Sequence, residues 1–301
     1  MASEKGYRMV VLAKQVPDTR HLSGEVMKPD GTVNRAALPA IFNPEDLNAL
    51  EMALQVRDEK GGHITVITMG PPSAAEILRD SLYRGADQVI LLTDRRFAGS
   101  DTLATSYALS CAVKQLGPVD LVFCGRQAID GDTAQVGPQT AEKLGIPQIT
   151  YAERIVQLEG DEIVVMRALE HGREMVRCSL PCLLTVVASA NRPRPPSARR
   201  RIEYKLAAAP HEYPALLQQW PEFESEAQLD SFLGARGLRI PVWSVDDIGV
   251  APDKVGLAGS PTQVYKINMV VLEKSETKEI PPTREGIVAL VQELVQEYII
   301  G

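Results

Sequence analysis

The sequence predicts an α/β fold with a doubly wound, mainly parallel sheet, followed by an extended arm and a terminal helix. Short apolar runs alternate with helical stretches up to about Ile149, and the alternation stops beyond residue 190. The runs are apolar at nearly every position, as in strands that helices cover on both faces. Strand and helix units that repeat in this way form parallel sheets with right-handed crossovers.

The first strand is predicted over residues 9–13 and is followed, after a polar excursion, by a helix that begins at Asn43. Asn43 suits the capping position, Pro44 suits the first helical position, and two carboxylates follow in the first turn. The remaining strands are predicted over residues 64–69, 89–92 and 121–124, and the remaining helices over about 73–84, 102–116 and 133–144.

Beyond Ile149 the strand signals at residues 162–166 and 183–187 have no helix between them, which predicts antiparallel strands that extend the sheet. Segment 191–201 is rich in proline and arginine, so we expect it to be extended and exposed. It is either a solvated linker or a segment that lies along an acidic partner surface.

The last segment carries an amphipathic helical pattern after a candidate cap, Thr283. Its apolar face consists of Ile287, Leu290, Val291, Leu294, Val295 and Tyr298. Such a face needs a surface to pack on, which is either a partner subunit or the chain's own sheet.

Composition excludes several classes of protein. The formal net charge of -7 argues against a nucleic-acid or anionic-membrane binder, because such proteins need a basic face. Cys111, Cys124, Cys178 and Cys182 show neither Cys-x-x-Cys spacing nor a nearby histidine pair, so no iron–sulfur or zinc site is indicated. Without a signal-peptide pattern or a membrane-spanning apolar stretch, we expect a cytoplasmic protein with no direct membrane insertion.

Ligands of parallel sheets bind outside the carboxyl ends of the strands, so the loops after the predicted strands are the candidates for a site. Gly70-Pro71-Pro72, residues 94–102 and residues 125–133 occupy these places. Asp132 or Thr133 is expected to lie at a helix N-terminus, which presents free N–H groups to a pyrophosphate.

In the last of these loops and just after it, Gly125, Gly131 and Gly137 leave room for a ligand and Arg126 supplies a positive charge. The residues themselves are equally consistent with a phosphorylated ligand and with glycine turns that carry ordinary helix caps.

Motifs for other chemistries are absent from the sequence. Neither Gly-x-Gly-x-x-Gly nor the P-loop pattern occurs, the four histidines are scattered, and there is no Gly-x-Ser-x-Gly elbow. Simple dehydrogenases, ATPases and hydrolases of those types are disfavoured. We expect no catalytic side chain, no metal site and no stand-alone catalysis.

The sequence resembles the electron-transfer flavoprotein β-subunit family in five segments that follow in order. They are residues 11–18, 43–51, 125–137, 180–186 with 191–194, and 259–262. The resemblance covers nearly the whole chain and implies a sheet of the adenine-nucleotide-binding type and an obligate heterodimer with the family's α subunit. It implies a nucleotide-binding domain at 1–190, a partner-wrapping arm or linker at 191–236, and an α-subunit-contacting segment with the terminal helix at 237–301.

The resemblance leaves two cofactors open. Housekeeping members of the family hold AMP in the β subunit, whereas NADH-dependent, electron-bifurcating members hold FAD there. Segments 69–72, 94–106 and 130–137 resemble the bifurcating pattern, so FAD is expected and AMP is the alternative. The implied reaction is hydride transfer from NADH to this FAD, after which one electron passes to ferredoxin or flavodoxin and one to the α-subunit FAD. The final acceptor is a dehydrogenase or a quinone-reducing module.

The resemblance also implies the binding residues. The FAD or AMP site is expected to contain Ala13, Asn43, Asp46, Thr68, Met69, Asp101, Thr102, Leu103, Thr105, Cys124, Gly125, Arg126, Gln127, Gly131, Asp132, Thr133, Gln135 and Val136. The NADH site is expected to contain Gly70, Pro71, Ala98, Gly99 and Ser100. Because the carboxylates of Asp101 and Asp132 would repel phosphate, we expect both to point away from it and to cap helices.

Overall fold

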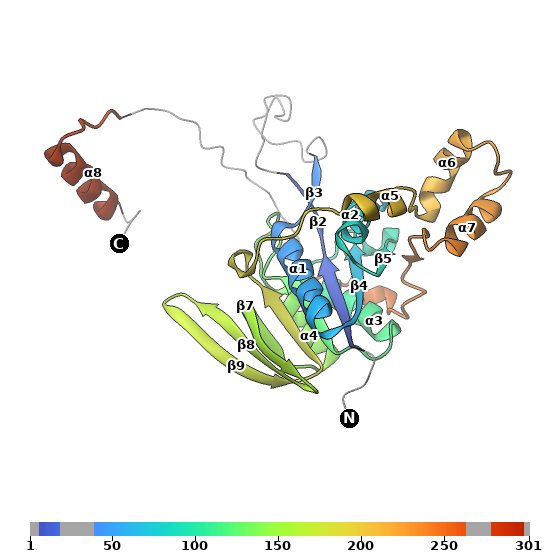
Figure 1. The fold of residues 1–301 in the computed structure, drawn as a ribbon, viewed down its shortest axis with the longest axis horizontal. Coiled ribbons are helices and arrows are strands. Elements are labelled where there is room, and N and C mark those ends of the chain that lie inside the picture. The colour runs from blue at the N-terminus through green and yellow to red at the C-terminus, as the bar shows by residue number, and fades with distance from the viewer. Residues whose placement is uncertain (1–5, 19–38, 263–277, 298–301) are drawn as a thin grey trace.

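The computed structural model describes residues 6–18, 39–262 and 278–297, and its centre is a nine-stranded sheet (Figure 1). The strand order is β11-β5-β4-β1-β6-β10-β7-β8-β9. Neighbours from β11 to β7 are parallel, and β8 and β9 add an antiparallel edge. The strands are β1 Tyr7–Ala13, β4 Gly62–Met69, β5 Gln88–Leu92, β6 Leu121–Gly125, β7 Gln148–Glu159, β8 Glu162–Leu169, β9 Gly172–Ser179, β10 Cys182–Val186 and β11 Val242–Trp243.

Helices cover both faces of the parallel part of the sheet. Side chains on β1 alternate between two cores: Val11 packs on the side of α1 and α2, while Val10 and Leu12 pack on the side of α3 and α4. The predicted doubly wound α/β fold is therefore confirmed. The helices are α1 Pro44–Lys60, α2 Ala75–Arg84, α3 Thr102–Gln115, α4 Val136–Leu144, α5 Ala198–Tyr204, α6 Tyr213–Gln219, α7 Glu226–Ala235 and α8 Arg284–Gln296.

The winding of the sheet reverses direction at β1. The chain passes from β1 outward to β4 and β5 and then returns to place β6 on the other side of β1. The loops after β1 and β6 therefore separate at the topological switch point, where open α/β sheets bind their ligands. The loop after β1 begins a short two-stranded ladder, β2 Gln15–Pro17 with β3 Ala40–Phe42.

The second half of the sheet differs from the prediction in one strand. β8 is antiparallel as expected, but β10 runs parallel to its neighbours and lies between β6 and β7. Residues 182–186 are all buried, as in a central strand, although the sequence does not show which strands flank them. The β7–β8–β9 meander carries the chain away from β6, and β10 then returns to it.

The predicted extended segment is extended only up to Ser197. Residues 198–204 form α5, because the prolines end before the helix and the Ser197 hydroxyl caps it by accepting a bond from Arg200 N. Before the helix, the Arg194 guanidinium pairs with Glu51 of α1 at 2.8 Å. The acidic surface along which this segment lies is therefore on its own chain.

Two further helices, α6 and α7, fall within residues 191–236, where the sequence predicted an arm (Figure 1). They pack on each other, and the Tyr213 hydroxyl donates to Asp230 at 2.8 Å. The division into nucleotide-binding domain, arm and partner-contacting segment stays a prediction.

The irregular C-terminal segment contributes to the core even though its sequence shows little periodicity. Val245, Ile248, Val250 and Val255 are buried on the α3 side of the sheet. Further along, Thr283 caps α8 by accepting a bond from Gly286 N, as predicted, while Tyr298 lies outside the described residues. None of the helices in the described ranges is long and apolar enough to cross a bilayer.

Candidate functional site

Asp46 connects the ends of the two strands at the switch point. Its carboxylate accepts bonds from Lys14 N, just beyond β1, and from Gly125 N, at the end of β6, both at 2.8 Å. The side chain is 5% exposed, and this burial raises its pKa to about 7, although both backbone N–H groups favour the charged form. Asp46 therefore joins the loops after β1 and β6 through one buried carboxylate.

Asn43 and Glu45 fix the first half of the loop after β6. The Asn43 amide donates to Gln127 O at 2.9 Å and accepts from Ile129 N at 3.2 Å, while Glu45 accepts from Gln127 N at 3.0 Å. Asn43 stands at the capping position of α1 with Pro44 at the start of the helix, as predicted, but within the described chain its side chain caps no backbone N–H of the first turn. Its polar atoms bind the loop instead.

Arg126 is bound within the protein. Its guanidinium pairs with Glu45 at 3.0 Å and lies 5.8 Å from the centre of the Tyr151 ring. A phosphate contact by Arg126 would therefore have to compete with Glu45.

The three glycines of this region have different roles. A Cβ at Gly125 would lie 2.6 Å from an Asp46 carboxylate oxygen, and one at Gly137 would lie 2.7 Å from the Cys124 sulfur. These two glycines allow α1 and α4 to pack on the sheet, so the prediction that they leave room for a ligand is wrong. At Gly131 no described atom lies within 4 Å of that position, so Gly131 alone faces open space.

The second half of the loop is exposed and left-handed. Gly131, Asp132, Thr133 and Gln135 are exposed, and φ is 49° at Asp132 and 53° at Ala134. Because this backbone cannot continue into a helix, α4 begins at Val136, and the prediction of a cap at Asp132 or Thr133 is wrong. The Asp132 carboxylate instead accepts from Gln127 Nε2 at 2.8 Å.

An ion pair links the two loops of the switch point. The Lys14 ammonium lies 2.7 Å from the Asp130 carboxylate. The sequence reading assigned neither residue to the site, although Lys14 and Asp130 lie inside segments that resemble the family.

The two helices behind the loops differ at their N-termini. Asp101 caps α3, as predicted, by accepting bonds from Leu103 N and Ala104 N at 3.0 Å. In the described structure, Gln135 gives α4 no side-chain cap, and because Pro138 has no N–H, the backbone N–H groups of Val136 and Gly137 are those that the first turn leaves for an anion. The Thr102 hydroxyl donates to Gln135 Oε1 at 2.9 Å and holds the two helix ends together.

Thr68 presents a polar atom that lacks a hydrogen-bonding partner. Its hydroxyl is buried at the carboxyl end of β4, beside Ala13 of β1, and forms no hydrogen bond with any described residue. Orphaned buried polar groups are rare and need an explanation. A bound nucleotide at this end of the sheet would supply one, so the site fits such a group.

The predicted NADH residues lie at two adjacent strand ends. Gly70 N donates to Leu92 O at 3.0 Å, which joins the turn after β4 to the end of β5. The C-terminal segment supports the other turn: Gly256 N donates to the Ser100 hydroxyl at 2.8 Å, and the Ser260 hydroxyl donates to Gly99 O at 3.1 Å.

Asp94 and Arg96, at the start of this turn, also bind the C-terminal segment. The Arg96 guanidinium bonds Asp94 and lies 2.7 Å from the Asp246 carboxylate. The hydrogen bonds from Arg96 lower the pKa of Asp94 to about 2. The turn is therefore fixed by residues from two distant parts of the chain.

The other predicted site residues lie in the same region. Leu103 is 40% exposed and Thr105 half-buried on the first turns of α3, while Met69 is half-buried on the opposite face from Thr68. Cys124 is buried under Gly137, and burial raises the pKa of its thiol. The structure thus brings the predicted residues together at the carboxyl ends of the parallel strands.

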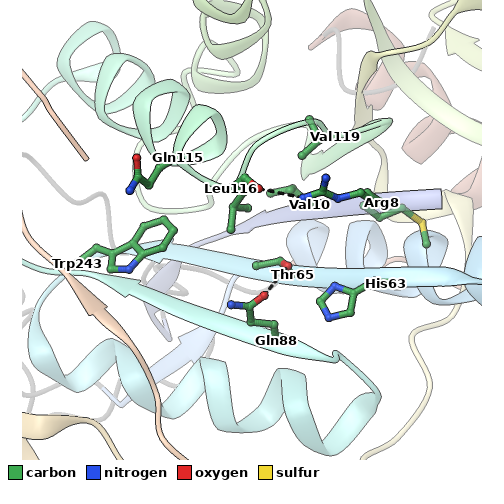
Figure 2. Close-up of a pocket in the computed structure, with 10 residues that line it drawn as sticks. Arg8, Val10, His63, Thr65, Gln88, Gln115, Leu116, Val119 and Trp243 are labelled. Atoms are coloured by element: carbon green, nitrogen blue, oxygen red, sulfur yellow. Dashed lines mark hydrogen bonds between the residues drawn. The ribbon is translucent and has the colours of Figure 1, made fainter. Parts of the chain in front are cut away.

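A separate hollow of 430 Å³ lies on the opposite side of the sheet's strand ends, near the amino ends of β1, β4 and β5 (Figure 2). Arg8 donates across it to Leu116 O at 2.9 Å, and Thr65 to Gln88 Oε1 at 3.4 Å, with Trp243 at one end. Parallel sheets bind ligands at the carboxyl ends of their strands, so this hollow is not the candidate site.

Comparisons with known proteins agree with the fold. Residues 30–211 match the electron transfer flavoprotein domain family. The electron transfer flavoprotein subunit beta of Clostridium acetobutylicum is 41% identical over 300 residues, covering 97% of this chain and 99% of that protein. The caffeyl-CoA reductase-Etf complex subunit CarD of Acetobacterium woodii is 42% identical over 260 residues, 86% of each chain. Protein FixA of Azorhizobium caulinodans is 43% identical over 266 residues, 86% of this chain and 83% of that one.

Proposed function

The chain belongs to the electron transfer flavoprotein β-subunit family, and from this premise we propose that it holds the FAD of an NADH-oxidising, electron-bifurcating heterodimer. Its partner in the proposal is the α subunit of the same family. The observation that carries the proposal is the exposed half of the β6–α4 loop, which faces open space at Gly131 and leads into the uncapped N-terminus of α4.

The residues of the site would hold the cofactor in three places. The backbone from Gly131 to the first turn of α4 would bind the pyrophosphate, and the unpartnered Thr68 hydroxyl would bond the adenosine side. Leu103 and Thr105 would approach the flavin ring, and the turns at Gly70 and Gly99 would receive NADH. The carboxylates near the pyrophosphate would each be engaged within the protein, because Asp101 caps α3, Asp130 pairs with Lys14 and Asp132 accepts from Gln127 Nε2.

The chemistry itself would come from the bound FAD, which would accept a hydride from NADH and pass its electrons on singly, one to ferredoxin or flavodoxin and one to the α-subunit FAD. The chain's own groups would fix the loops around it. The Lys14–Asp130 pair spans the two loops, and the C-terminal segment holds the turn at Ser100. Two related proteins carry reductase names, caffeyl-CoA reductase-Etf complex subunit CarD and acryloyl-CoA reductase electron transfer subunit gamma, which supports a reductase or dehydrogenase as the final acceptor.

The cofactor content of the purified heterodimer tests this proposal. We expect two FAD molecules per heterodimer and bleaching of flavin absorbance on titration with NADH. Extraction under conditions that do not strip flavin, followed by chromatography, counts FAD and AMP separately. One FAD and one AMP, with no bleaching by NADH, would establish the AMP-holding form of the subunit instead.

Gly131→Val tests the place of the pyrophosphate. A Cβ at this position has no described atom within 4 Å, so the fold and the heterodimer should be unaffected. If the pyrophosphate passes this residue, the β-site affinity for FAD should fall on the order of tenfold or more, since about 1.4 kcal/mol of crowding corresponds to a factor of ten. Flavin content measured after gel filtration is the readout. Unchanged occupancy would refute the placement.

A further inference from the structure

A second hollow, of 580 Å³, lies beside the site between α3, α4 and the C-terminal segment. Its charged lining consists of three lysines, Lys114, Lys143 and Lys254, and one carboxylate, Asp253. We infer that this lysine hollow is the docking surface for an acidic electron carrier. The inference rests on the proposed function, which requires such a carrier, the ferredoxin or flavodoxin, to reach this subunit.

The lysine hollow is built around one aromatic ring. The ammonium groups of Lys143 and Lys254 each lie 5.8 Å from the centre of the Tyr107 ring. Such cation–π contacts gather positive charge without neutralising it. Ala251 N donates to the Tyr107 hydroxyl at 3.3 Å and so joins the C-terminal segment to α3, while the Lys114 ammonium donates to Lys143 O at 2.8 Å.

Charge is the strongest argument for an acidic partner. None of the three lysines forms an ion pair with a carboxylate in residues 6–18, 39–262 or 278–297. The chain as a whole carries a formal charge of -7, so the hollow is a local reversal of sign on an acidic protein. Such a patch steers a carrier with a carboxylate-rich surface toward this side of the molecule.

The chemistry of the hollow favours a protein surface over a small anion. Lysines are flexible point charges, whereas tight phosphate sites present donors in a fixed, converging geometry. The two serine hydroxyls of the lining already bond backbone carbonyls, Ser110 to Tyr107 O at 2.8 Å and Ser260 to Gly256 O at 2.6 Å. Leu103 adds an exposed apolar side chain to the lining, and a small surface of mixed charge and apolar character is typical of transient redox encounters.

The position of the hollow suits electron transfer from the proposed flavin. Leu103 belongs both to the hollow and to the first turn of α3, which would approach the flavin ring. Lys114 lies on the same helix about 16 Å further along its axis, at a rise of roughly 1.5 Å per residue. A carrier that covers the whole hollow would therefore reach from the lysines to the end of α3 that faces the cofactor site.

The test compares two triple variants of the whole heterodimer that change its charge equally. Lys114→Gln, Lys143→Gln and Lys254→Gln together should weaken ferredoxin binding on the order of tenfold at low ionic strength, with a smaller difference at high salt. The control combines Lys60→Gln, Arg154→Gln and Arg177→Gln, which are exposed and lie outside the hollow. It should bind nearly as the wild type does. The readout is the Kd from titration of ferredoxin at two salt concentrations.

A second measurement locates the surface directly. In the wild-type heterodimer, acetylation of the three lysines by a water-soluble reagent, followed by mass spectrometry, should slow when ferredoxin is present. Three lysines that resist acetylation without ferredoxin would overturn the inference, because the α subunit would then cover them. Equal weakening by both triple variants would overturn it as well.

Two further outcomes separate this inference from its premise. Phosphate binding that is lost in the lysine variant while the Kd for ferredoxin stays unchanged would identify a small-anion site and refute the docking surface. Flavin content and NADH bleaching test the proposed function independently. If the heterodimer holds two FAD and NADH bleaches them, but the lysine substitutions do not change its affinity for ferredoxin, only the inference is overturned.

Discussion

Gly125→Val is expected to destabilise the protein by about 3 kcal/mol or more, a large effect for one substitution. A Cβ at this position would lie 2.6 Å from an Asp46 carboxylate oxygen and 2.8 Å from Asp46 N. Neither atom can move freely. Asp46 N belongs to the backbone of α1, and the carboxylate oxygen of Asp46 accepts the hydrogen bond from Gly125 N. Overpacking of this kind typically costs about 1–3 kcal/mol, and loss of the buried hydrogen bond adds to it.

Thermal unfolding of the heterodimer measures this effect, with Gly131→Val as the matched control. A loss of about 3 kcal/mol corresponds to a fall in Tm of roughly 6–12 °C for a domain of this size. With flavin removed from both proteins, so that the expected loss of FAD affinity does not affect Tm, the control should unfold near the wild-type temperature, because a Cβ at Gly131 has no described atom within 4 Å. Equal effects of the two substitutions would show that the α1–β6 contact is looser than described.

The sequence predicts the first half of the fold well because its strands are central. The runs at residues 9–13, 64–69 and 89–92 are apolar except for Thr65 and Thr68, are bounded by polar or glycine-containing turns, and each becomes a buried strand. The meander is less visible, because β9 is mostly exposed and its pattern is polar. The return of β10 to the middle of the sheet depends on contacts far apart in sequence, which periodicity does not report.

Within the site, residue type indicated the place but not the role of each side chain. Asn43 and Asp46 read as cap and dipole partners of a helix, since their positions before and inside its first turn suit both roles. In the structure their polar atoms bond a loop more than 70 residues away, at Gly125, Gln127 and Ile129. Only the three-dimensional approach of α1 to β6 decides between the two roles.

The same limit applies to the glycines. Gly125, Gly131 and Gly137 are indistinguishable as letters, and all three lie in a loop and helix start that follow a strand. Two of them are contacted by another element where a side chain would project, and one is not. A sequence pattern reports that a side chain is absent, while the structure shows whether protein or open space fills its place.

Asp46→Asn is expected to change how stability depends on pH. Burial raises the pKa of Asp46 to about 7, above the ordinary value near 3.8, so the folded state binds a proton that the unfolded state releases. This contribution to stability is fully present below about pH 4 and is lost as pH rises through 7. The asparagine does not titrate, so this part of the pH dependence should disappear in the variant.

The variant also loses a hydrogen bond, so it should be less stable than the wild type at a pH where Asp46 is protonated. Its amide oxygen can accept from Lys14 N or from Gly125 N, but its NH2 group cannot accept from the other, and a buried donor left unbonded costs about 1–3 kcal/mol. The variant should therefore be less stable than the wild type at pH 5, and the gap should narrow by pH 8, where the wild type carries a buried charge. Urea unfolding at several pH values measures the gap, and hydrogen exchange at Lys14 and Gly125 locates it. A gap that widens with pH would mean that the two N–H groups hold Asp46 ionised throughout, and that its charge stabilises the switch point rather than opposing it.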